Sequence, residues 1–143
     1  EVSNNISADQ EYFLIVYYPT LDLTESAIPQ TSLINSSNYT GALIQDPTNP
    51  RIVLFSKTET PQTSATYDVV YSGTGKHLIV NLQPGNYNVF KNSVLVSGSP
   101  FTVDANGTLY FESLGGSTFT ITQSSIPPQD TTPPSPPTGV TVQ

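Results

Sequence analysis

The sequence of 143 residues contains no cysteine, no methionine and no tryptophan, and it has one histidine and only four lysine and arginine residues. Without cysteine the chain can form no disulfide, no thiolate metal site and no thiol nucleophile. A single histidine excludes a zinc site built from several histidines. Four cations against eleven acidic residues give a net charge of −7. Such a chain cannot neutralise a run of phosphates, so we expect no nucleic-acid partner.

Long apolar runs are also absent. The longest, Tyr12–Tyr18, is far shorter than the roughly 20 residues that cross a bilayer, so no membrane span is expected. Only 10% of the residues are charged, against about a quarter in average proteins, and the abundant Thr, Ser, Asn and Tyr are typical of extracellular β-domains. The chain begins at Glu1 without Met and shows no n-region or h-region, so we expect that any signal peptide has been removed or lay upstream. We therefore expect a piece of a longer secreted protein.

The segments between residues 11 and 122 are short, strand-like and separated by turn residues. No segment has sustained helical periodicity. The sequence predicts an all-β fold: an antiparallel β-sandwich of about eight to ten strands with a Pro-rich C-terminal tail.

Four regions follow from the composition. Residues 1–10 are polar and predict a disordered N-terminal segment, and residues 11–123 predict the β-sandwich domain. Residues 124–137 hold six of the thirteen prolines and predict a semi-rigid linker. Residues 138–143 read as a single strand without a partner.

Three local patterns predict how the chain runs inside the sandwich. Tyr12–Tyr18 is apolar on both faces and predicts a central strand. Residues 20–40 have no regular pattern and predict a long loop. The Asn-Gly pair in Asp104–Gly107 is typical of tight hairpin turns with positive φ.

Alternation in residues 76–82 predicts which side chains face the core. One face carries Leu78, Val80 and Leu82, which we expect to point inward. The opposite face carries His77, Ile79 and Asn81.

His77 is the only side chain that titrates near neutral pH, which raises the question of catalysis. A catalytic triad needs a nucleophile and an acid around the histidine. Ser72 and Asp68 lie near in sequence, but strand alternation gives no reason for them to converge on His77. We interpret His77 as a structural or surface histidine and expect no enzymatic activity.

The acidic residues leave two kinds of site open. A glycosidase needs two carboxylates about 5 or 6.5–9.5 Å apart, and the sequence offers Asp22 with Glu25 or Asp46 with Asp68. Calcium binds loop carboxylates and carbonyls, and the best loop donors are Asp22, Glu25 and Asp46. We favour solvated loop carboxylates over both sites and expect no cofactor, with a structural calcium ion at these three residues as the alternative.

Carbohydrate binding uses exposed aromatic rings that stack on sugar rings. The tyrosines that the pattern places at a strand end, in a loop or on an outer face are Tyr18, Tyr39 and Tyr110. The negative net charge disfavours an anionic glycan as a direct ligand. Four Asn-x-Ser/Thr triplets, at Asn5, Asn35, Asn38 and Asn106, would carry glycans only in a eukaryotic source.

Two groups of motifs resemble known families. Asp130-Thr-Thr-Pro-Pro-Ser-Pro-Pro-Thr-Gly-Val-Thr-Val142 resembles the linker and first strand of a fibronectin type III domain in bacterial extracellular proteins. This resemblance implies that residues 138–143 are the stub of such a domain. The second group resembles the β-sandwich domain that follows the catalytic domain in heparinase II/III-like polysaccharide lyases. Its motifs are Phe13-Leu-Ile-Val with Tyr18-Pro19, Arg51–Ser56, Lys76–Leu78 with Asn81-Leu82, Pro84–Val89 and Asp104–Leu109. In such lyases the chemistry lies in a separate domain, so no catalytic residue carries over.

The residues and the resemblance together predict a non-catalytic accessory module of a secreted, multidomain carbohydrate-active protein. Its role would be structural support or weak glycan binding, with polysaccharide and the neighbouring domains of its own chain as partners. The alternative is a purely structural spacer or adhesin-like stalk domain with no ligand.

Overall fold

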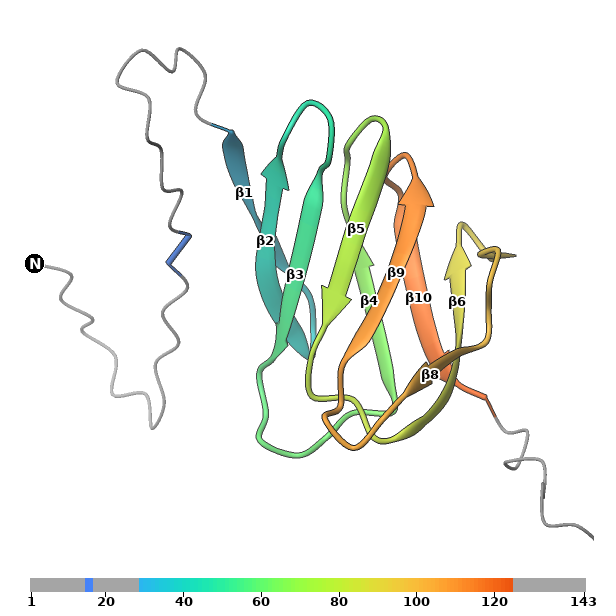
Figure 1. The fold of residues 1–143 in the computed structure, drawn as a ribbon. Coiled ribbons are helices and arrows are strands. Elements are labelled where there is room, and N and C mark those ends of the chain that lie inside the picture. The colour runs from blue at the N-terminus through green and yellow to red at the C-terminus, as the bar shows by residue number, and fades with distance from the viewer. Residues whose placement is uncertain (1–14, 17–28, 125–143) are drawn as a thin grey trace, which may run out of the picture.

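The computed structural model describes residues 15–16 and 29–124, and the strands within them form two sheets that pack face to face (Figure 1). The predicted all-β sandwich of eight to ten strands is confirmed. The strands are β1 Gln30–Asn35, β2 Tyr39–Gln45, β3 Arg51–Ser56, β4 Ser64–Asp68, β5 Thr74–Ile79, β6 Gly85–Lys91, β7 Val94–Leu95, β8 Phe101–Val103, β9 Leu109–Leu114 and β10 Thr118–Gln123.

The first sheet has the strand order β1-β2-β3-β5-β9, and the second has the order β4-β10-β6-β7, with β8 also paired to β6. All these neighbours run antiparallel except β3 and β5, which are parallel. The parallel pair forms because the strand between them in sequence, β4, belongs to the second sheet. After β3 the chain crosses to β4 in the second sheet and then returns to the first sheet. Strands β3 and β5 therefore both begin at the same end of the first sheet.

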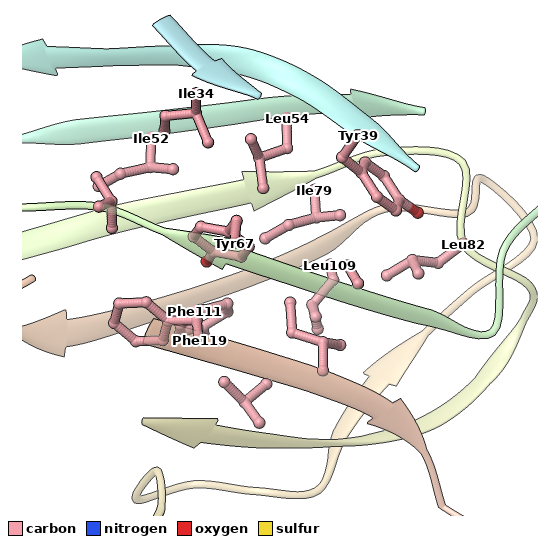
Figure 2. Packing of buried hydrophobic residues seen from close by; sticks show 14 of the residues in the cluster. Ile34, Tyr39, Ile52, Leu54, Tyr67, Ile79, Leu82, Leu109, Phe111 and Phe119 are labelled. Atoms are coloured by element: carbon pink, nitrogen blue, oxygen red, sulfur yellow. The ribbon is translucent and has the colours of Figure 1, made fainter. Parts of the chain in front are cut away.

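The core lies between the sheets and consists of inward-facing side chains from every second strand position (Figure 2). Strand β9 shows the rule most clearly, because buried and exposed residues alternate along its whole length. Leu54 and Ile79 of the first sheet lie opposite Tyr67 and Phe119 of the second, and all four are buried.

The predicted loop over residues 20–40 is wrong for its last part, where β1 and the start of β2 form an antiparallel pair joined by a short turn. Within β1 only Ile34 is buried, so this edge strand shows no apolar alternation in sequence. Ser36 and Tyr39 close the turn with a main-chain hydrogen bond of 2.9 Å.

The predicted inward face of residues 76–82 is wrong for β5. His77 and Ile79 are fully buried, whereas Leu78 and Val80 are half-buried on the outer side. Leu82 is buried as predicted, but it reaches the core because Asn81 has a φ of 64°. That left-handed residue turns the chain and breaks the alternation on which the prediction relied.

The predicted hairpin at Asp104–Gly107 is also wrong. This turn joins β8 of the second sheet to β9 of the first, and only Gly107 has a positive φ. The tight hairpin with two positive-φ residues is instead Asn92–Ser93, between β6 and β7.

Only Ile15 and Val16 of the predicted central strand Tyr12–Tyr18 are described, and the prediction is wrong for these two because they lie outside any strand and are exposed. The N-terminal segment 1–10, most of the linker 124–137 and the fibronectin-like stub 138–143 lie outside the described residues. No helix in the described part could cross a membrane.

Candidate functional site

The outer face of the first sheet carries two rows of side chains that the strand pairing aligns. Because β1, β2, β3, β5 and β9 are hydrogen-bonded in register, residues paired on neighbouring strands lie side by side on one face. The apolar row is Leu33, Ala42, Val53, Leu78 and Tyr110. A second row lies two residues from the apolar row on each strand and consists of Thr31, Ile44, Arg51, Lys76 and Glu112. We call it the charged row because its last three members are charged.

The apolar row is open to solvent at both ends. Leu33 is 72% exposed and Tyr110 is 51% exposed, and Phe55 lies beyond Val53 on β3 with 40% exposure. The solvent face of such a sheet is ordinarily polar. Between these ends Ala42 is buried and Val53 and Leu78 are half-buried, so the exposed apolar surface lies at the two edges of the sheet and at Phe55.

The charged row brings together two of the four cations in the chain. Arg51 and Lys76 are paired in register on the parallel strands β3 and β5, so their backbones lie about 4.8 Å apart. Neither side chain makes a hydrogen bond with a described residue, whereas the charge of Arg51 acts on the carboxylate of Asp46. Like charges placed side by side on a sheet destabilise it, and here Glu112, the register partner of Lys76, and Asp46, on which Arg51 acts, supply opposite charge nearby.

The other two cations have structural roles. Lys57 Nζ donates to the main-chain carbonyl of Ser36, and Lys91 Nζ donates to that of Leu114. Each ammonium group therefore ties a strand to a neighbouring loop or strand end. Arg51 and Lys76 differ from both in having their donors available.

Glu112 lies directly opposite Lys76 on β9, but its carboxylate is directed to Tyr110. The Tyr110 hydroxyl donates to Glu112 Oε1, and this hydrogen bond, together with slight desolvation and the charge of Glu112, raises the pKa of Tyr110. The contact fixes one end of an exposed aromatic ring.

Of the three tyrosines predicted for ligand binding, the structure describes two, and these two differ in exposure. Tyr110 faces outward and is exposed, as predicted. Tyr39 does not lie in a loop: it is the first residue of β2, has no exposed surface, and cannot stack on a sugar. Tyr18 lies outside the described residues.

Of the predicted calcium donors only Asp46 is described, since Asp22 and Glu25 lie outside the described residues. Asp46 Oδ1 accepts hydrogen bonds from the Thr48 amide at 2.8 Å, the Thr48 hydroxyl at 2.7 Å and the Asn49 amide at 3.1 Å. The bonds to Thr48 are the main cause that lowers the pKa of Asp46, with Arg51 a minor one. No three metal-ligating side chains gather among residues 15–16 and 29–124. Asp46 therefore serves the turn between β2 and β3.

His77 belongs to a buried polar chain rather than to an open site. Tyr71 donates its hydroxyl proton to the carbonyl of Ser113 at 3.1 Å, so it must accept the 2.7 Å hydrogen bond from His77 Nε2–H. Nδ1 is then unprotonated and accepts from the Tyr67 hydroxyl at 2.7 Å. Both ring nitrogens are satisfied, and the histidine is structural, one of the two interpretations that the sequence left open.

Aromatic packing encloses the imidazole. It stacks on Phe111 with ring centroids 4.4 Å apart and an angle of 8°, and it lies 4.6 Å from Phe119. Burial, with a smaller contribution from the charge of Lys91, lowers the pKa of His77 to about 3. The ring is therefore neutral and cannot exchange protons with a substrate at physiological pH.

The sequence analysis did not identify Arg51 and Lys76 as a pair. The only signal was the scarcity of cations, because the two residues are far apart in sequence and a strand of the other sheet, β4, lies between them. Their adjacency depends on the parallel pairing of β3 and β5.

Comparison with known proteins adds one match. Residues 33–123 match the family model described as the heparinase II C-terminal domain, a stretch from the middle of β1 to the end of β10. No curated protein matches the chain.

Proposed function

Because the chain belongs to the heparinase II C-terminal domain family, we propose that it is a non-catalytic accessory module of a secreted polysaccharide lyase whose outer sheet face contacts glycan. The family match is the observation that carries this proposal. A domain described as the C-terminal part of a heparinase has a polysaccharide context and neighbouring domains.

The state of His77 supports a non-catalytic role. Proton transfer in a lyase requires a group within hydrogen-bonding reach of substrate. His77 has no exposed surface, and both of its ring nitrogens are hydrogen-bonded to tyrosines. We assign the chemistry to a separate domain of the parent protein.

Tyr110 supports the glycan contact. Its ring is half exposed, is anchored through Glu112 and lies at the end of an apolar row, next to Leu78. An immobilised aromatic ring beside polar side chains can stack on the apolar face of a sugar without losing much side-chain entropy. With one well-exposed tyrosine among residues 15–16 and 29–124, we expect the contact to be weak.

Replacing Tyr110 with alanine is expected to weaken glycan binding roughly fivefold, because the stacking surface, worth about 1 kcal/mol, is lost. Affinity electrophoresis against a panel of neutral and acidic polysaccharides measures the change. Tyr110→Phe keeps the ring and should retain most of the binding.

Val94→Ala is the matched control, since Val94 is an exposed apolar residue of the second sheet. It should bind like the wild type. If the wild-type chain is not retained by any polysaccharide of the panel, the glycan contact is wrong. The spacer or stalk domain without a ligand would then be the remaining interpretation.

A further inference from the structure

We propose that the groove between the edge strands β1 and β4 is the docking surface for the domain that precedes this one in the parent protein. The inference rests on the part of the proposed function that makes the chain a C-terminal module with neighbouring domains, and it adds where the contact lies. The glycan contact at Tyr110 plays no part in it, so the two proposals can fail separately.

The groove lies at one open side of the sandwich, where β1 and β2 of the first sheet face β4 of the second. Its volume is about 260 Å³, and the buried side chains Ile34, Leu43 and Val69 line it. Two further lining residues are open to solvent: Leu33 on β1 is 72% exposed, and Val70 after β4 is 82% exposed. An apolar groove with large apolar side chains exposed on both of its sides is typical of a surface that another protein covers.

The chain enters the sandwich next to this groove. Strand β1 begins at Gln30, and the register partner of Gln30 is Gln45, which lines the groove. A domain joined upstream of β1 is therefore tethered beside the groove, and a short tether gives an effective concentration on the order of 1 mM. A contact too weak to hold two separate proteins together can then hold these two domains together.

The sequence upstream of β1 contains apolar surface that this sandwich does not bury. Tyr12–Tyr18 is the longest apolar run of the chain, and its two described residues, Ile15 and Val16, are exposed. The family match begins at residue 33, so the run lies outside the matched domain. A run that is apolar on both faces is stable in a core or an interface. Residues 19–29 join it to β1 and span at most about 40 Å, which keeps apolar surface within reach of the groove.

The other open side of the sandwich is less suited to an apolar partner. Although Val94 is exposed there, its groove of about 290 Å³ is lined by the charged residues Lys91 and Glu112. The one charged side chain that lines the β1/β4 groove, Asp68, accepts a hydrogen bond from the Thr118 hydroxyl. Strand β1, the outermost strand of the first sheet (Figure 1), has six residues and none of them is charged. Edge strands that stay in water ordinarily carry charge or proline, so an uncharged edge is expected where another domain covers it.

The test compares amide hydrogen exchange in the 143-residue chain and in the full-length parent protein. We expect the amides of β1 and of residues 68–70 to exchange about tenfold more slowly in the parent, because docking excludes water from them. The amides of β7, at the opposite edge of the second sheet from β4, should exchange equally in both. Leu33→Asp and Val70→Asp place a charge in the contact and should each abolish the extra protection. Val94→Asp, the matched control on the opposite side, should retain it.

Leu33 and Val70 are exposed, so neither variant should change the urea midpoint of the 143-residue chain, and lost protection then reports the contact rather than unfolding. Protection in the parent that survives both substitutions would overturn the docking surface, and so would equal exchange of β1 in the two proteins. If that equal exchange is slow, the occupant is residues 1–29 when it is independent of protein concentration, and a second copy of the chain when it is not. None of these outcomes alters polysaccharide binding through Tyr110, which tests the proposed function separately.

Discussion

Replacing His77 with alanine is expected to lower the free energy of unfolding at pH 7 by about 4 kcal/mol. The substitution leaves a cavity where the imidazole stacks on Phe111, and it removes the acceptor of the buried Tyr67 hydroxyl. The free energy of unfolding of a domain of this size is about 5–15 kcal/mol, so a large part of it depends on this one side chain. Denaturation by urea, followed by the fluorescence of the tyrosines, measures the loss.

A double-mutant cycle separates the hydrogen bonds from the packing. His77→Phe keeps a stacked ring but leaves the Tyr67 hydroxyl unpaired, at a cost of about 1–3 kcal/mol. Tyr67→Phe removes that hydroxyl, so the double variant should recover part of the loss. A loss below about 1 kcal/mol for His77→Ala, or additive effects in the cycle, would contradict the buried chain of hydrogen bonds.

The buried chain and the outer site share two strands. His77 lies between Lys76 and Leu78 on β5, and its register partner on β9 is Phe111, between Tyr110 and Glu112. The stack of His77 on Phe111 therefore holds β5 and β9 together directly beneath Lys76 and Tyr110. We infer that the interior chain fixes the spacing of the residues on the outer face.

The fold class was predictable because most strands alternate strictly, as in β9, or are bounded by clear turns such as Asp46–Pro50. Strand β1 was missed because an edge strand buries only Ile34, so its sequence resembles a loop. The same error placed Tyr39 in a loop, although the residue is fully buried. The face of β5 was misassigned because the turn at Asn81 cannot be recognised from alternation alone.

The site was less predictable than the fold. The exposure of Tyr110 follows from local alternation, which the sequence contains. The pairing of Arg51 with Lys76 follows from long-range topology, because the intervening β4 crosses to the other sheet before β5 returns. The composition showed only that the chain has few cations. It could not show that two of them are neighbours on one sheet.

Acidification from pH 7 to pH 5 is expected to lower the free energy of unfolding by about 2 kcal/mol through His77 alone. The pKa of His77 is about 3 in the folded protein and near 6.5 in the unfolded chain. Between these values the unfolded chain binds one proton more than the native protein, so stability rises with pH in this window and falls as the pH drops. Above pH 6.5 both states hold a neutral ring, and this contribution is fully retained.

The variant His77→Gln tests this assignment, because glutamine can offer a donor to Tyr71 and an acceptor to Tyr67 but does not titrate. We expect it to be less stable than the wild type at pH 7, since the stack on Phe111 is lost, but to lack the decrease between pH 7 and pH 5. Carboxylates contribute little above pH 5, where they are ionised in both states. Urea unfolding of both proteins at pH 5, 6 and 7 measures the difference. If the free energy of unfolding of His77→Gln falls between pH 7 and pH 5 as much as that of the wild type, His77 is not the group that titrates. The imidazole would then be hydrated or charged in the native protein.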